Sequence, residues 1–422
     1  MKHFTLFLSL FLLHALNGMS AIFPDKDILS WPDSTQNKIE LSGNFYFGSN
    51  AITTRFAKAY YTGEFIHDQL KDQVSKKLIN LNRFGGELKA SIELSYKPDT
   101  FFNHTNCWWT LGISDVNSIS GRFRKDAFEI YFRGNANYGG VNAQMSDFDF
   151  SLIHYQQIKF LFGHIQRHDS STSSWYGGIG VNKGQNFFKI SSPRANLYTP
   201  EDGSYLDVDL DLTLRGQDSL RKNTDTWNGS GLSFWLGYAY EYPNGDRISA
   251  GMQNIGWIRW NDRSYYIHSD STFHFEGIDA SPVFNFSDSI HHEITSDSSF
   301  VQGFLTTREK RNYRQWIPGR FYATYEAGFK NTDLRFNFGV EYFVFTSAIP
   351  RSWCTIRYQK KNQSLGFTPS YGGFSTLQFG LDYSVRFAKS WEFHAELPAL
   401  FNMALGSKSR AAGAFVSLAK YF

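Results

Sequence analysis

Long stretches of strict two-residue alternation constrain the fold of this chain more than any other feature. Between residues 87 and 97, apolar side chains occupy every second position, and the positions between them carry Glu, Lys or Ser. Residues 205–215, 334–344 and 377–387 repeat this pattern. Such alternation is typical of β-strands with one apolar and one polar face. The stretches are about twice as long as the roughly 5 to 6 residues usual in globular domains, so they predict strands that could cross a membrane at a tilt.

The composition excludes a bundle of membrane-spanning helices. Beyond Ala21 no apolar run approaches the ~20 residues that a spanning helix needs, and the mean hydropathy is negative although 18% of the residues are aromatic. A closed barrel reconciles these properties, because only alternate residues face lipid. We therefore expect an all-β fold, a transmembrane antiparallel up-and-down β-barrel of about 14–16 strands with short helical insertions, forming one unit over residues 21–422. The alternative is a soluble periplasmic β-sandwich or propeller.

Both ends of the sequence are typical of an exported outer-membrane protein. A basic start, an apolar run over residues 4–16 and small residues up to Ser20 predict a signal peptide over residues 1–20. Phe422 closes an amphipathic strand, and a terminal aromatic residue is similar to the assembly signal of outer-membrane barrels. We therefore expect the protein in the bacterial cell outer membrane. Its expected partners are outer-membrane lipid and, during biogenesis, the barrel-assembly machinery.

Sixteen candidate strands can be read from the pattern. They are 39–48, 84–98, 106–115, 150–166, 173–191, 195–200, 204–215, 230–242, 247–260, 264–277, 318–330, 333–347, 351–360, 373–388, 390–401 and 411–422. Since single-chain bacterial barrels prefer even numbers, loss of the weakest candidate, 195–200, would imply fourteen strands. A periplasmic Phe422 places the turn at residues 243–246 on the periplasmic side as well.

Three stretches interrupt the β pattern. Residues 64–81 space Ile66, Leu70, Val74 and Leu78 four apart, which predicts an amphipathic helix lying as a plug or lid across the barrel mouth. Residues 118–144 contain a second helical candidate, 126–133. Residues 279–316 form a long insertion loop, which the strand count places on the periplasmic side.

Several short motifs resemble one family over nearly the whole mature chain. They are Asn82-Arg83-Phe84-Gly85-Gly86, Tyr155-Gln156-Gln157-Ile158, Val181-Asn182-Lys183-Gly184-Gln185, Leu197-Tyr198-Thr199-Pro200-Glu201-Asp202-Gly203, Phe275-Glu276-Gly277-Ile278-Asp279 and Trp316-Ile317-Pro318. The chain thereby resembles an uncharacterised family of outer-membrane barrels from Bacteroidota. That family is distantly similar to barrels of the long-chain fatty acid transporter type. The resemblance implies 14 strands, passage of hydrophobic molecules or a role in a secretion machinery, and no catalytic residues.

The sequence offers little evidence for an enzyme or a metalloprotein. No nucleophile-elbow pattern occurs, and His291-His292-Glu293 lacks the spacing usual among zinc ligands, so we expect no catalytic residues, metal or cofactor. Asp207, Asp209 and Asp211 share one face of a strand; they either bind a cation or form a polar lumen wall offset by Arg and Lys, and we favour the wall. Cys107 and Cys354 are expected as free thiols. The net charge of +3 gives no indication of a nucleic-acid partner.

Two functions remain open at the level of sequence. Trp235, Trp257, Phe343 and Phe345 are candidates for an apolar pocket inside a polar lumen, which favours passage or uptake of small, hydrophobic molecules. The alternative is a non-transporting scaffold or accessory barrel of a secretion or surface-attachment complex, with that complex's subunits as partners. We favour transport.

Overall fold

The computed structural model describes most of the chain. The described residues are 37–101, 104–217, 227–276, 308–329, 332–388, 390–404 and 406–422. The expected signal peptide over residues 1–20, the His291-His292-Glu293 motif and most of the 279–316 insertion lie outside these residues.

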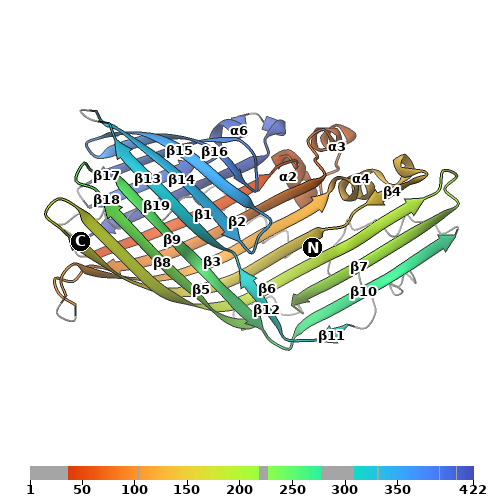
Figure 1. Ribbon diagram of the computed structural model, residues 1–422, viewed down its shortest axis with the longest axis horizontal. Coiled ribbons are helices and arrows are strands. Elements are labelled where there is room, and N and C mark those ends of the chain that lie inside the picture. The colour runs from red at the N-terminus through yellow and green to blue at the C-terminus, as the bar shows by residue number, and fades with distance from the viewer. Residues whose placement is uncertain are drawn as a thin grey trace.

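One antiparallel sheet closes on itself (Figure 1), because its first strand pairs with both its second and its last. Phe45 lies opposite Leu88 on one side and opposite Ala414 on the other. The barrel has 14 strand positions within the described residues. In order around the barrel these are β1 (Asn37–Ser49), β2 (Leu81–Tyr96), β3 (Cys107–Arg124), β5 (Phe148–Arg167), β6 (Thr172–Thr199), β7 (Tyr205–Gln217) with β8 (Gly229–Glu241), β9 (Arg247–Trp260) with β10 (Ser264–Glu276), β11 (Glu309–Lys310) with β12 (Tyr313–Ile317) and β13 (Gly319–Gly328), β14 (Leu334–Val344), β15 (Ile349–Lys360), β16 (Gln363–Gly373), β17 (Gln378–Phe387), β18 (Trp391–Leu397) and β19 (Ala411–Tyr421).

The fourteen positions confirm the expected range of about 14–16 strands. The sixteen candidates exceed fourteen because two positions were each counted as two strands and one long strand was divided. β7 and β8 both run antiparallel to β6, so they are two parts of one interrupted position. β9 and β10 form the next position in the same way. Residues 195–200 belong to β6, which is 28 residues long. The pattern also missed β16, because Pro369 and several glycines read as turn signals although the strand pairs along its length.

The two ends of the barrel differ (Figure 1). At the Phe422 end lie the C-terminus and short turns such as residues 242–246, whereas helices gather at the opposite end, here called the helix end. Its elements are α2 (Thr54–Thr62), α3 (Asp68–Ser75), α4 (Lys125–Arg133), η2 (Ala136–Tyr138), β4 (Val141–Gln144), α6 (Leu400–Ala404) and η3 (Gly406–Lys408). None of the helices described is long and apolar enough to cross a membrane.

β10, the last described strand before the 279–316 insertion, ends at the helix end and not at the end shared with Phe422. β10 ends at Glu276 opposite Tyr205, the first residue of β7 at the helix end. The strand count places this insertion at the Phe422 end because it treats the two halves of interrupted positions as separate strands. Whether the insertion is periplasmic stays a prediction. The last described residues of this segment also form β11 and most of β12 rather than loop.

The helical insertions were partly predicted. α4 matches the expected helix at 126–133 and ends at Gly134, whose N–H bonds to Ile130. The expected helix at 64–81 is shorter, since α3 covers only Asp68–Ser75. A preceding helix, α2, was missed; it begins where the Thr53 hydroxyl accepts the Phe56 N–H and ends at Gly63, which has a positive φ of 67°.

Candidate functional site: the barrel lumen

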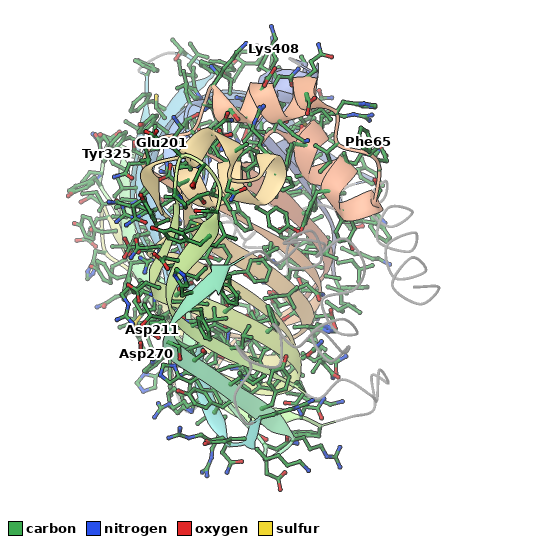
Figure 2. The ribbon with its side chains drawn as sticks, turned by 90° about the vertical axis from the view of Figure 1, so that its right-hand side faces the viewer. Phe65, Glu201, Asp211, Asp270, Tyr325 and Lys408 are labelled. Carbon is green, nitrogen blue, oxygen red and sulfur yellow. The ribbon has the colours of Figure 1, made fainter. Side chains whose placement is uncertain are left out.

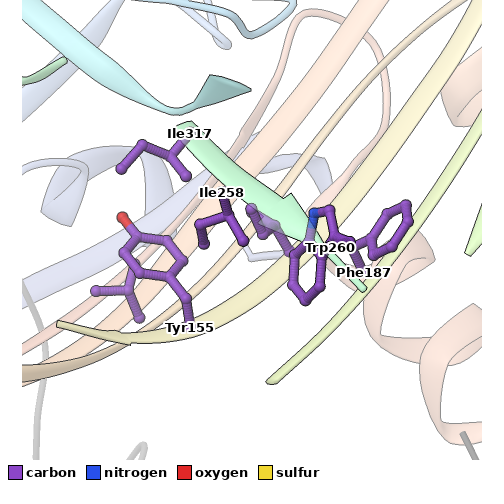
Figure 3. Packing of buried hydrophobic residues seen from close by; sticks show 7 residues of the cluster. Tyr155, Phe187, Ile258, Trp260 and Ile317 are labelled. Atoms are coloured by element: carbon purple, nitrogen blue, oxygen red, sulfur yellow. The ribbon is translucent and has the colours of Figure 1, made fainter. Parts of the chain in front are cut away.

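A cluster of apolar side chains fills part of the lumen (Figure 3), and we call it the lumen cluster. Its members come from β3, β5, β6, β9 and β12 and are Val116, Ile153, Tyr155, Phe187, Ile258, Trp260 and Ile317. Ile258, Trp260 and Ile317 have no exposed surface. Phe187 stacks on Trp260 with ring centroids 4.5 Å apart. The lumen at this level is thus occupied by side chains that water does not reach.

Small residues and one bulge place these large side chains inside. A Cβ at Gly184 would stand 2.6 Å from the Trp260 ring, so only glycine leaves room for the indole there. The ladder between β8 and β9 shifts register between Phe234 and Leu236, opposite Asn254, which has a positive φ of 58°. This extra residue turns Ile258 and Trp260 inward.

A polar layer borders the lumen cluster on the side of the Phe422 end. The Gln157 amide nitrogen lies 2.7 Å from the Asn182 and Asn254 side-chain oxygens and 3.0 Å from Ser233 Oγ. Asn254 in turn donates to the Tyr155 hydroxyl at 2.9 Å. Two residues further along β5, on the same inward face, Lys159 pairs with Glu93 at 2.7 Å. The amide layer therefore links the neighbouring strands β5, β6, β8 and β9 along the lumen wall.

Charged side chains continue this layer on the opposite wall. Glu341 accepts from Arg351 at 2.8 Å and lies 3.6 Å from Arg320, and the Glu341 and Arg351 side chains are only 0% and 2% exposed. Arg320 also donates to Gln253 at 2.8 Å. Removal of one partner would leave a buried charge uncompensated, which destabilises a folded protein strongly.

The predicted lumen residues Trp235 and Phe343 do point inward. Trp235 packs with Trp108, Leu161 and Ile165 in a second apolar cluster, nearer the Phe422 end. Phe343 packs against a third cluster, formed by Tyr46, Ala348 and Phe374. Both positions follow the simple alternation of their strands.

The other two predicted lumen residues, Trp257 and Phe345, lie on the outer surface. Trp257 pairs laterally with Trp316, and Phe345 stacks on the Trp316 ring at 4.9 Å with an interplanar angle of 15°. The extra residue at Asn254 moves Trp257 from the inward to the outward face of β9. Phe345, directly after β14, has a positive φ of 61°, which turns its side chain outward. The correct members, Ile258 and Trp260, were missed because Arg259 between them reads as the lumen-facing residue.

The aspartate row lies on the inward face of the tall wall made by β6, β7 and β10. Arg194 binds both Asp209, at 2.9 Å, and Asp270; Figure 2 shows Asp270 beside Asp211 on the neighbouring strand. His274 lies 2.5 Å from Asp207, and His268 lies 3.7 Å from Asp211. In the described residues no group of three or more His, Cys, Asp or Glu side chains is arranged to hold a metal ion. The arrangement favours a polar wall over a cation site.

The apolar stripe of the expected plug helix is buried, but not in the lumen. Val74 is fully buried, and Ile66, Leu70 and Leu78 pack around it in a cluster with Phe56, Phe123 and Phe128. Phe84 and Phe123 belong to this cluster and share the outward strand faces of Ile92 and Ile113. We call α2, α3, α4, η2 and β4 the helical cap; it covers the outer side of the wall.

The helical cap is also held by polar contacts. Arg133 bonds to Asp72 at 2.6 Å, which joins α4 to α3. Tyr138 donates to Asp126 at 2.9 Å. Burial, and then this hydrogen bond, raise the pKa of the Tyr138 hydroxyl above its usual value.

Phe422 and the two cysteines occupy the outer surface and the barrel seam. The Phe422 N–H bonds to the Asn37 carbonyl at 3.0 Å, next to the pairing of β1 with β19, and the residue is 53% exposed. Cys107 is buried and Cys354 half-buried, and both are free thiols.

A closed antiparallel barrel with a packed lumen and an apolar outer surface defines the class of transmembrane β-barrels. Within it, the chain belongs to a family of unknown function, DUF5723, whose model matches residues 34–395. This confirms the expected uncharacterised barrel family. No curated protein matches the sequence.

Several solved barrels are similar in fold. The translocator domain of the autotransporter NalP from Neisseria meningitidis is 8% identical over 92% of this chain and 90% of that chain, with a TM-score of 0.36. The P. putida toluene transporter TodX is 8% identical over 93% and 91%, with a TM-score of 0.42. A Pseudomonas aeruginosa FadL homologue is 7% identical over 92% and 90%, with a TM-score of 0.40.

Proposed function

We propose that this protein resides in the bacterial outer membrane and passes or takes up small hydrophobic molecules through its lumen. The outer surface supports the location. Along β14, for example, Phe338, Val340 and Tyr342 point outward and are each more than 40% exposed. Similar exposed residues occur around the barrel, including Ile92, Ile113, Ile158, Val181, Leu236, Phe321 and Leu365. A soluble protein rarely exposes a contiguous apolar surface of this extent, whereas lipid would cover it.

Exposed aromatic side chains border this apolar surface at both ends. At the Phe422 end they are Trp175, Tyr238, Tyr242, Tyr325, Tyr358, Phe387 and Phe422, and at the helix end they are Trp316, Phe345, Tyr371 and Phe401. Two aromatic girdles around an apolar band are the arrangement of transmembrane barrels. If Phe422 is periplasmic, the helix end, at the opposite end of the barrel, is exposed to the cell exterior.

The single observation that carries the transport proposal is the lumen cluster. A hydrophobic molecule that displaces Phe187 or moves past Trp260 exchanges one set of apolar contacts for another. A polar solute entering the same space would lose its hydrogen bonds to water without replacement. The neighbouring amide layer supplies the few convergent polar groups that orient ligands in apolar pockets.

Binding to the lumen cluster can be measured directly. Purified protein in detergent should bind an apolar fluorescent dye that a monoaromatic hydrocarbon displaces. Phe187→Gln should weaken binding about tenfold or more, since a buried amide without partners costs roughly 1–3 kcal/mol. Phe345→Gln, on the outer surface, is the matched control and should leave the affinity unchanged. Equal affinities in all three proteins would contradict the proposal.

A scaffold or accessory barrel of a secretion or surface-attachment complex is the second candidate. It is favoured by the complete burial of Trp260, Ile258 and Ile317, which fill part of the lumen, and by the helical cap, which offers a partner surface at one end. Co-purification of partner subunits from native membranes, without binding of hydrophobic molecules, would support this candidate instead.

A further inference from the structure

The outer surface changes abruptly from apolar to polar along one line across the strands. Successive lateral partners on β3, β5, β6, β8, β9 and β12 are Ile113, Ile158, Val181, Leu232, Trp257 and Trp316. The next outward residues toward the helix end, in the same order, are Asp115, Gln156, Lys183, Ser230, Arg259 and Arg314. A single step along each strand therefore crosses from the apolar band to polar side chains.

Three of these polar residues, Lys183, Arg259 and Arg314, are cations, and we call them the cationic row. Arg259 and Arg314 are direct lateral partners and both exposed. Lateral pairing of like charges is unfavourable unless a counter-charge compensates it. In the described part of the chain, no carboxylate forms an ion pair with either arginine. Asp115, on the same line, is engaged by His154 at 3.0 Å.

Aromatic rings hold the cations at the edge of the apolar band. The Arg314 guanidinium lies 4.3 Å from the centre of the Trp257 ring and 5.1 Å from that of Trp316. Lys183 Nζ lies 5.8 Å from the centre of the Trp227 ring. Stacking uses the face of a guanidinium and leaves its N–H edge available to an anion.

The position of the row corresponds to a lipid headgroup region. From Trp175 to Lys183, β6 rises roughly 20 Å along the barrel axis at a tilt near 40°. This is close to the ~25 Å height of a transmembrane barrel's apolar band. On β6, the row thus begins where acyl chains end and phosphate groups begin.

We propose that the cationic row binds the phosphate groups of a phosphorylated glycolipid in the outer leaflet. The inference rests on the membrane location and orientation proposed above. Two arginines side by side match clustered phosphate oxygens, because each guanidinium can donate two parallel hydrogen bonds to one phosphate. The flanking Trp257, Trp316 and Phe345 rings contact the upper part of the acyl chains.

Lipid binding by the purified full-length mature protein tests this inference. Native mass spectrometry would compare retention of lipid A with retention of the same lipid after removal of its phosphates, with inorganic phosphate as a competitor. The wild-type protein should retain the phosphorylated lipid preferentially. Replacing Lys183, Arg259 and Arg314 together by Gln should lower its affinity about a hundredfold, from roughly fivefold for each cation. Lys360→Gln removes an outward cation at the Phe422 end and should have no effect.

The outcomes separate this inference from the proposed function. Equal retention of both lipids, an unchanged affinity in the triple variant, or full displacement by inorganic phosphate would overturn the inference. If the triple variant loses heat-modifiable migration, Arg259→Gln and Arg314→Lys are measured singly, and each should lower the affinity severalfold. A wild-type protein that does not insert into vesicles at all would contradict the membrane location itself.

Discussion

At the residue scale, the barrel uses large side chains on both of its faces, and their neighbours decide what each contributes. Trp260 is fully buried over Gly184 and against Phe187, whereas Trp316 stacks on the outer surface with 45% of its surface exposed. Both are strand tryptophans on neighbouring positions. Only Trp260 buries its apolar surface away from both water and lipid.

We therefore expect Trp260→Ala to destabilise the barrel by about 3–5 kcal/mol, because it leaves a cavity in the packed lumen. Trp316→Ala should cost far less, since it removes a side chain from the outer surface. Unfolding in urea, followed by gel migration of folded and unfolded forms, measures both. Equal costs would mean that the inward face of β9 or the outward face of β12 has been assigned wrongly.

Whether a residue faces the lumen could be predicted from sequence wherever a strand is regular. Alternation alone placed Trp235, Phe343 and the aspartate row correctly on the inward faces. It failed at Trp257 and Phe345, because a bulge at Asn254 and a left-handed residue after β14 each shift the period by one. Glycine often marks such an irregularity in a sequence, but Asn254 and Phe345 are not glycines, so neither position carries a strong signal in the sequence.

At the scale of elements, the helical cap is a separate layer on the barrel wall. The apolar face of its helix α3 packs against Phe123 and Phe128 and does not enter the lumen. The sequence predicted that Ile66, Leu70, Val74 and Leu78 share a buried face, but it could not say against which surface they pack. Strand length was similarly ambiguous: β7 and β8 each resemble a complete strand, and only pairing with β6 shows that they share one position.

We predict that Val74→Asp detaches the helical cap while the barrel stays folded, because a carboxylate would have to be buried without a partner. Limited proteolysis should then cut within residues 54–81, and heat-modifiable migration should persist. Lys77→Asp, on the exposed side of the same segment, should remain resistant. Loss of the folded band in Val74→Asp would show instead that the cap is integral to the barrel.

At the scale of the whole molecule, an apolar band outside and a layered lumen inside give the barrel two different environments. Lumen layers alternate along β5 from Ile153 and Tyr155, through Gln157 and Lys159, to Leu161. The apolar layers of this lumen offer contacts that the proposed hydrophobic molecules would share. Sequence composition predicted the closed barrel, but the layering depends on which strands meet across the lumen.

Uptake by cells tests the central claim most directly. An outer-membrane host without a comparable barrel would express the wild-type protein or Ile317→Asp, which places a carboxylate in the lumen cluster. Entry of a radiolabelled monoaromatic hydrocarbon and of a small sugar would be followed in parallel. The account predicts faster hydrocarbon entry with the wild-type protein only, and unchanged sugar entry in both strains. Hydrocarbon entry equal to that of cells without the protein, or an equal rise for the sugar, would contradict it.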